Sequence, residues 1–264
     1  MKQRVISGIV MVPIFLALMY FGGLFLEIAM LLATIVAIRE FYKGFQACNV
    51  YPSFLVGYAW VAALYIFGSN IFIKGAPEPM FLMAWIATGV MASSMYIFRV
   101  DRRKPEDGMA TMLGIIYIAF FFFHIVLVEE SYHIMVWLIF LAAFGSDICA
   151  YFTGYFLGKH KMAPHLSPKK TWEGFFGGIL GGTLVCGLFG YLFVPEAMMH
   201  CFIIGGIAAV FSVFGDLTAS AYKRTMGIKD YGKLIPGHGG IMDRFDSVLY
   251  TAPVVFYYIQ FMHL

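Results

Sequence analysis

The sequence predicts an all-α, polytopic integral membrane protein with about nine transmembrane helices and a polar cleft that faces the cytoplasm. Of its 264 residues, 61% are hydrophobic and only 12% are charged. Mean hydropathy is +0.81, and long apolar runs recur along nearly the whole chain. Because soluble domains carry about a quarter charged residues, this composition excludes a water-soluble enzyme, a disordered chain and a nucleic-acid binder.

Apolar runs bounded by glycine, proline or charge predict the individual spans, since a spanning helix needs about 20 mainly apolar residues. The first run follows a basic N-terminus, but no small-residue cleavage site precedes the second. We therefore expect a retained helix rather than a signal peptide. The predicted spans are 5–22, 24–43, 54–69, 79–98, 109–128, 134–157, 174–193, 200–222 and 247–262.

The positions of Lys and Arg predict the orientation of these spans, because cytoplasmic loops retain positive charge. With this set of spans, 17 of the 18 basic residues fall on the side of the N-terminus, and Lys74 alone falls on the other. We therefore expect the N-terminus and the polar loops in the cytoplasm. A basic face also attracts phosphates, but for the cluster 99–104 we favour a purely topological role.

A polar region begins at Asp216, at the end of an apolar span. If the helix continues beyond its last apolar turn, one face carries a carboxylate, a hydroxyl and two cations. A carboxylate on an otherwise apolar helix is costly and indicates a function. The residues of this face are Asp216, Ser220, Lys223 and Arg224.

The same region continues to Asp246 with residues suited to a nucleotide triphosphate and a metal ion. Glycines in the segment 236–240 allow close backbone approach, so its N–H groups are candidates to line an anion. Carboxylates hold Mg²⁺, while Lys and Arg neutralise phosphate. The alternative is a solvated loop with Asp246 or Ser247 as a helix N-cap. The candidates here are Lys229, Asp230, His238, Gly239, Gly240, Asp243, Arg244 and Asp246.

A second polar region covers residues 145–174. Asp147 lies inside a predicted span and is followed at helical spacing by Tyr151, Gly154 and Gly158. We favour close helix packing as the role of the two glycines. A loop then presents two cations and two hydroxyls that would suit phosphate, although Thr171 also fits a helix N-cap. The loop residues are Ser167, Lys169, Lys170 and Thr171.

The segment from Ser220 to Asp246 resembles the signature of the phosphatidate cytidylyltransferase, or CDP-diacylglycerol synthase, family. It contains S, two residues, KR, four residues, KD, then G, P, HGG, DR and D. Asp147, SPKKTWEG and Gly215-Asp216-Leu217 also resemble that family, so the motifs cover roughly the C-terminal half. One departure is Ala219, because an acidic residue often precedes the signature serine in the family.

This resemblance implies a polytopic, Mg²⁺-dependent enzyme that converts CTP and phosphatidic acid to CDP-diacylglycerol and pyrophosphate. It implies Asp216 and Asp243 as metal ligands that converge on one site, with Asp246 in support. The other catalytic candidates are Lys223, Arg224, Lys229, Asp230, His238 and Arg244. The substrate-binding candidates are Asp147, Tyr151, Ser167, Lys169, Lys170, Thr171, Ser220, Gly239 and Gly240.

The resemblance also implies a place in the bacterial cytoplasmic (inner) membrane, with the active site on the cytoplasmic side of the bilayer. We expect one membrane domain over residues 1–264, with N-terminal spans in 1–133 and catalytic spans and loops in 134–264. No nucleic-acid partner is expected. A homodimer is suggested by the resemblance and by the glycine-rich spans.

Two other classes of function remain open at this point. One is another CTP-using lipid enzyme, either an isoprenoid-alcohol kinase or a related cytidylyltransferase, which needs the same metal and phosphate sites. The other is an ion-coupled transporter that uses Asp147 and Asp216 as coupling carboxylates. The transporter leaves the basic, glycine-containing loop before Asp243 unexplained.

Overall fold

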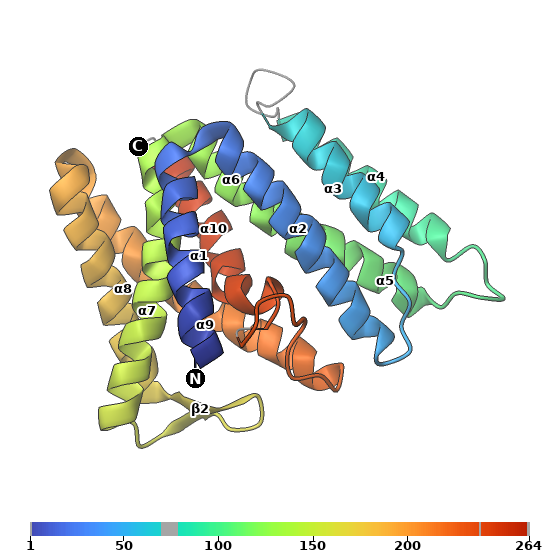
Figure 1. Cartoon of the computed structure of the whole chain (residues 1–264). Helices are drawn as coiled ribbons and strands as arrows, with labels where there is room; N and C mark the ends of the chain where they lie inside the picture. Colours follow the sequence, from blue (N-terminus) through green and yellow to red (C-terminus); the bar gives the residue numbers. More distant parts are fainter. Residues whose placement is uncertain (1, 70–78, 238, 263–264) are drawn as a thin grey trace. The chain divides into compact units, whose positions relative to one another are not determined.

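The computed structural model describes residues 2–69, 79–237 and 239–262, and these are almost entirely helical (Figure 1). Every range predicted as a membrane span contains a helix. The elements are α1 (Lys2–Phe21), α2 (Gly23–Gln46), α3 (Phe54–Gly68), α4 (Pro79–Tyr96), α5 (Pro105–Leu113), the π-helical η1 (Gly114–Phe120), α6 (Phe121–Tyr132), η2 (His133–Met135), α7 (Val136–Leu157), β1 (Lys161–Ala163), β2 (Ser167–Thr171), α8 (Trp172–Phe193), η3 (Pro195–Ala197), α9 (Met198–Thr225) and α10 (Met242–Met262).

The chain divides into two compact units. Unit 1 contains residues 1–133 and 223–244, and unit 2 contains residues 134–222 and 245–264. The division after His133 falls where the N-terminal spans were expected to end. The segment 223–244, which carries most of the signature, belongs to unit 1 and thus folds with the N-terminal helices.

Unit 1 has its core along α2, whose buried face includes Ile38, Phe41 and Tyr42. The Tyr42 hydroxyl donates to the Thr111 carbonyl at 2.6 Å, because a buried phenol needs a hydrogen-bond partner. Gly57 leaves room for this ring, since a Cβ there would lie 2.7 Å from it. These contacts hold the C-terminal part of α2 against α3 and α5.

Unit 2 is built around the close pair α7 and α8, which run side by side (Figure 1). A Cβ at Gly174 would lie 2.8 Å from the Ala150 carbonyl, and one at Gly154 would lie 3.7 Å from the Gly174 Cα. Small residues let two helix backbones approach in this way. The close-packing interpretation of Gly154 is therefore confirmed.

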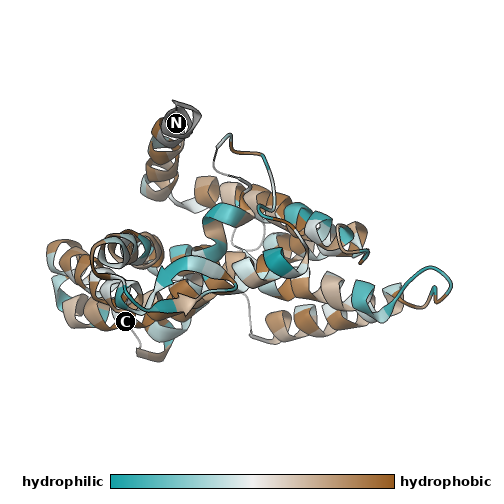
Figure 2. Ribbon diagram, turned by 90° about the horizontal axis from the view of Figure 1, so that it is seen from below, coloured by the Kyte–Doolittle hydropathy of each residue, from teal (hydrophilic) through white to brown (hydrophobic). Residues whose placement is uncertain are grey.

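Length and composition identify three described stretches able to cross a membrane: Pro105–Leu157, Trp172–Phe193 and Pro195–Thr225. Shorter apolar helices cover Met11–Phe21, Phe54–Gly68 and Met80–Tyr96. Hydrophobic residues dominate the helices and hydrophilic ones gather in the connections (Figure 2). The all-α membrane class is thus supported, and the number of nine spans stays a prediction.

The segment Ser167–Thr171 differs from its prediction as a loop. It forms strand β2, which pairs antiparallel with β1, with Lys161 opposite Thr171 and Ala163 opposite Ser167. The prediction was wrong because five mainly polar residues containing a proline have no strand pattern of their own. A neighbouring segment supplies the backbone partners.

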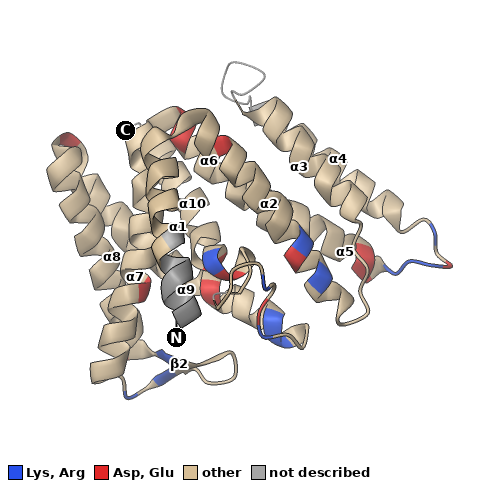
Figure 3. Cartoon of the chain, viewed as in Figure 1, with Lys and Arg blue, Asp and Glu red and all other residues tan. Residues whose placement is uncertain are grey.

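Charge is unevenly distributed within each unit (Figure 3). In unit 2 the paired strands β1 and β2, which precede α8, carry Lys161, Lys169 and Lys170. Glu196 follows the other end of α8. In unit 1, Lys and Arg gather on the loop before α5, the end of α2 and the segment 223–244, whereas Glu129 lies near the end of α6. Within each unit the basic residues therefore lie away from these glutamates, and the orientation in the membrane stays a prediction.

Candidate active site

Asp216 lies in helix α9, and two side chains from the predicted set contact it. Helix α9 continues to Thr225, which confirms the predicted helical extension. The half-buried Asp216 accepts a hydrogen bond from the Ser220 hydroxyl at 3.2 Å. Its other oxygen lies 2.8 Å from Lys170 Nζ of strand β2. Strand β2 therefore places Lys170, a predicted phosphate ligand, in direct contact with Asp216, a predicted metal ligand.

Asp147 and Asp246 are linked within unit 2 through Ser247. The Ser247 hydroxyl donates to Asp147 at 3.1 Å, and its backbone N–H donates to Asp246 at 2.9 Å. Helix α10 begins at Met242, so the alternative of Asp246 or Ser247 as its N-cap is wrong. Ser247 was predicted only as that cap. The sequence signal for its contacts with the two acids was a hydroxyl-bearing residue directly after Asp246.

Helices α9 and α10 approach each other closely beside Asp216. A Cβ at Gly215 would lie 2.5 Å from the backbone carbonyl oxygen of Asp246. A side chain larger than hydrogen at position 215 would separate the two helices. Gly215 therefore keeps the backbone that carries Asp216 next to the backbone that carries Asp246.

Asp243 organises the signature segment of unit 1 from a buried position, with an exposed fraction of 5%. It accepts hydrogen bonds from Lys223 Nζ at 2.9 Å, the Tyr231 N–H at 2.9 Å and the Gly240 N–H at 3.0 Å. Lys223 Nζ also lies 5.4 Å from the centroid of the Tyr231 ring. A carboxylate has about four lone-pair positions, so Asp243 keeps limited capacity for a further ligand.

A basic pocket of about 560 Å³ lies in the segment 229–244 of unit 1. Three cations and one acid surround it. Gly237 and Gly239 also line it, and their backbone φ angles are 79° and 90°. Such a set suits phosphate. Lys233 was counted only toward topology, although its place between two signature motifs was a signal. The lining residues are Lys229, Asp230, Gly232, Lys233, Ile235, Pro236, Gly237, Gly239 and Arg244.

The backbone N–H groups of two predicted glycines are already used within this segment. The Gly239 N–H donates to the Ile235 carbonyl at 3.1 Å, and the Gly240 N–H donates to Asp243. That these N–H groups line an anion therefore stays a prediction, and an anion would have to compete with these internal bonds. The glycines instead allow the turn, because Gly239 has a left-handed φ that other residues rarely adopt. His238 lies outside the described residues.

Several other predicted site residues have different surroundings. Tyr151 is 66% exposed on α7, and its ring stacks on Tyr155 with centroids 6.3 Å apart. Thr171 is buried and caps α8, accepting from the Gly174 N–H at 3.1 Å. Ser167 is half-buried, whereas Lys169 and Arg224 are exposed. Within its own unit, none of these described residues makes a hydrogen bond or ion pair with Asp216 or Asp243.

No group of three or more His, Cys, Asp and Glu side chains suited to a metal ion occurs among the described residues. Asp216 belongs to unit 2 and Asp243 to unit 1, and each unit is described by itself. Their convergence on one ion therefore stays a prediction.

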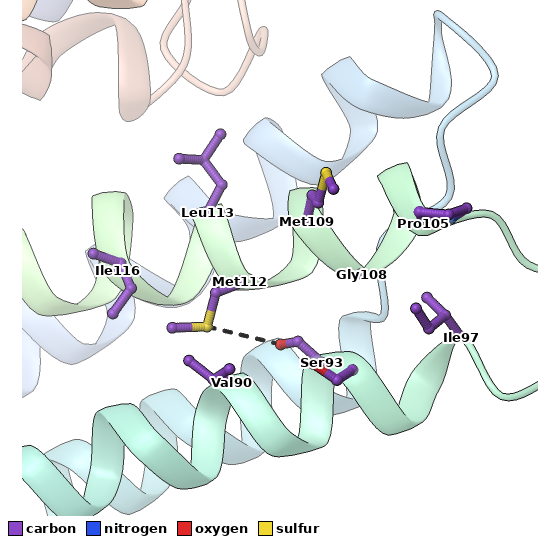
Figure 4. Close-up of a pocket in the computed structure, with 10 residues that line it drawn as sticks. Val90, Ser93, Ile97, Pro105, Gly108, Met109, Met112, Leu113 and Ile116 are labelled. Carbon is purple, nitrogen blue, oxygen red and sulfur yellow. Dashed lines mark hydrogen bonds between the residues drawn. The ribbon is translucent and has the colours of Figure 1, made fainter.

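A separate apolar pocket of about 500 Å³ lies between α4 and the α5–η1 helix of unit 1 (Figure 4). Val90, Met109 and Met112 are among its lining residues, and the polar contact drawn there joins the Ser93 hydroxyl to the Met112 sulfur at 4.0 Å. No signature residue lines this pocket. Its lining contains no charged residue and so does not suit phosphate.

A helical membrane protein with a basic, glycine-containing pocket fits an enzyme that handles phosphates at a lipid surface. The chain belongs to the cytidylyltransferase family, whose sequence profile matches residues 2–262.

Similarity to individual family members extends along almost the whole chain. A phosphatidate cytidylyltransferase from Staphylococcus aureus is 30% identical over 260 residues, covering 97% of both chains. One from Staphylococcus epidermidis is 31% identical over 261 residues with the same coverage. One from Synechocystis is 28% identical over 289 residues, covering 97% of this chain and 96% of its own. The similarity thus includes the N-terminal half, which the motifs alone did not reach.

Proposed function

We propose that this chain makes CDP-diacylglycerol and pyrophosphate from CTP and phosphatidic acid. The observation that carries the proposal is the basic pocket, which is lined by the signature residues Lys229 and Arg244 and by Lys233 between them. The relatives that match 97% of this chain are named phosphatidate cytidylyltransferase. Phosphate-binding cations next to a membrane-embedded helix are what a reaction between a nucleotide and an anionic lipid requires.

The proposed reaction needs no covalent enzyme intermediate, because the phosphate of phosphatidic acid is itself a nucleophile. One of its oxygens bonds to the α-phosphorus of CTP. The bond from that phosphorus to the oxygen bridging to the β-phosphate breaks, and pyrophosphate leaves with the electron pair. The protein then has to hold the two phosphates in line and neutralise the leaving group. Lys229, Lys233 and Arg244 are the proposed phosphate ligands in unit 1, and Lys170 is the one in unit 2.

Mg²⁺ is the proposed cofactor, with Asp216 and Asp243 as ligands and Asp246 in support. The donor chemistry fits, because carboxylate oxygens suit this hard cation. Proteins usually hold Mg²⁺ with one or two carboxylates together with substrate phosphates and water, so a group of three acids is not needed. When bound, the ion would spread the negative charge of the triphosphate. Asp216 is the more accessible ligand, since 29% of its side chain is exposed against 2% for Asp243.

The proposed setting is the cytoplasmic leaflet of a bacterial inner membrane, where both substrates meet. The basic ends of the two units support a cytoplasmic active site. A homodimer is part of the same proposal, supported by the glycine-rich helix α8, although that helix already packs closely on α7.

The decisive experiment measures pyrophosphate released from CTP by the purified protein in detergent micelles, with and without phosphatidic acid, over a Mg²⁺ titration. We expect release only when CTP, phosphatidic acid and Mg²⁺ are all present, together with a lipid product that contains cytidine. A kinase would release CDP with an alcohol acceptor and no pyrophosphate. A transporter would leave CTP intact, and either result would overturn the proposal.

A further inference from the structure

Glu40 is a buried acid near the C-terminal end of α2, far in sequence from the signature. Its exposed fraction is 7%, and one of its oxygens accepts a hydrogen bond from the Met242 N–H at 2.9 Å, across 202 residues of sequence. Met242 is the first residue of α10. A helix start has unpaired N–H groups and a partial positive charge, so a carboxylate at this point both caps α10 and fixes where it begins.

Two glycines of the signature segment lie against this carboxylate. A Cβ at Gly232 would lie 2.7 Å from Glu40 Cδ. A Cβ at Gly240 would collide with the same group, and its three nearest atoms all belong to Glu40. Glycine at these positions therefore lets the Glu40 carboxylate touch the backbone of the segment that forms the basic pocket.

The segment between Tyr231 and Met242 is thus held by two carboxylates. Asp243 accepts from the N–H groups of Tyr231 and Gly240, and Glu40 accepts from Met242. Gly232 and Gly239 also line the basic pocket. Because the contacts of Glu40 and Asp243 are with backbone on both sides of the turn, a change in either acid would change the shape of the pocket wall.

We propose that Glu40 is a positioning residue, which sets the shape of the phosphate pocket without touching the substrate. The inference rests on the proposed function and adds to it a residue of the N-terminal unit that none of the motifs contains. Burial of a carboxylate is costly unless hydrogen bonds compensate for it. A chain that required only a helix cap here would be served by a short neutral side chain on the helix itself.

The first test compares Glu40→Gln with Glu27→Gln in the pyrophosphate assay. Glu27 is a matched control, because it is equally buried on the same helix but lies about 20 Å along the axis from Glu40. We expect Glu40→Gln to raise the KM for CTP at least tenfold while the amount of folded protein and the melting temperature stay near those of Glu27→Gln. An unchanged KM with only a lower apparent kcat would indicate a merely structural role and overturn the inference.

The second test uses glycine substitutions in two backgrounds. Gly240→Ala should reduce CTP binding about tenfold in the natural chain and less than threefold in the Glu40→Ala background, since the colliding carboxylate is then absent. Gly239→Ala is the control, because a Cβ there would meet Asp243 and the residue has a left-handed φ. Its effect should be the same in both backgrounds. Equal effects of Gly240→Ala in both backgrounds would contradict the contact.

Failure of this inference and failure of the proposed function give different results. If the natural chain releases no pyrophosphate from CTP and phosphatidic acid, the function itself is refuted. If the natural chain is active and the Glu40 variants keep its KM for CTP, only the positioning role is refuted.

Discussion

Lys170 Nζ and Asp216 Oδ2 lie 2.8 Å apart and join strand β2 to helix α9. Lys170 also donates to the Val213 carbonyl at 3.4 Å, so the lysine contacts α9 at two points. With 21% of the lysine side chain and 29% of the aspartate side chain exposed, the pair is accessible to a ligand. A proposed phosphate ligand and a proposed metal ligand thus form an ion pair with each other.

Asp216→Asn should strongly reduce Mg²⁺-dependent turnover while the protein still inserts and folds. Asparagine keeps the shape and the hydrogen bond with Ser220 but loses the charge, so we expect a loss of about 10²-fold or more, as for other lost transition-state electrostatics. The measurement is pyrophosphate release against Mg²⁺ concentration. Asp101→Asn, a change of an exposed loop acid, is the control. Natural turnover and Mg²⁺ response in Asp216→Asn would exclude this ligand.

Lys170→Gln should impair the enzyme more than Lys169→Gln. Both lysines were expected to contact phosphate, but only Lys170 is half-buried against α9, whereas Lys169 is exposed on the strand. We expect Lys170→Gln to raise the KM for CTP or phosphatidic acid about tenfold, and Lys169→Gln to change it less than twofold. Steady-state kinetics with each substrate varied in turn would test this order. Equal small effects would mean that both lysines serve only topology.

Asp243→Asn should destabilise the fold, unlike Asp216→Asn. It leaves Lys223, with only 12% of its side chain exposed, without its ionic partner, and breaking a buried pair costs about 3 kcal/mol or more. We expect a lower melting temperature and faster proteolysis between residues 223 and 242. The double change Lys223→Met with Asp243→Asn should recover part of the stability. A natural melting temperature in Asp243→Asn would show that the pair does not stabilise the segment.

Cysteine labelling should place the signature segment in the cytoplasm. Native Cys48 is exposed and lies in a predicted cytoplasmic connection, so its labelling in the unmodified chain is the reference, and it is replaced in the variants. In a Cys48→Ser background, Lys233→Cys should react with an impermeant thiol reagent only after cells are permeabilised. Glu196→Cys, on the predicted outer side, should react in intact cells. Labelling of Lys233→Cys in intact cells would contradict the predicted orientation.

The sequence by itself determined the membrane class, the approximate helix ranges and the family, because these depend on local information. Apolar runs are contiguous, and the signature from Ser220 to Asp246 is a single segment with fixed spacing. The same local logic predicted the continuation of α9, since Asp216 and Ser220 are separated by one helical turn and their side chains do form a hydrogen bond.

Tertiary structure alone decided which of these residues meet and which serve the fold. Lys170 and Asp216 are 46 positions apart and Glu40 and Met242 are 202 apart, so no periodic pattern links them. Strand β2 exists because β1 supplies backbone partners, and Gly240 is needed because a carboxylate from α2 occupies the space beside it. Burial and pairing of charges depend on how the helices pack, and that packing sets the surroundings of every site residue.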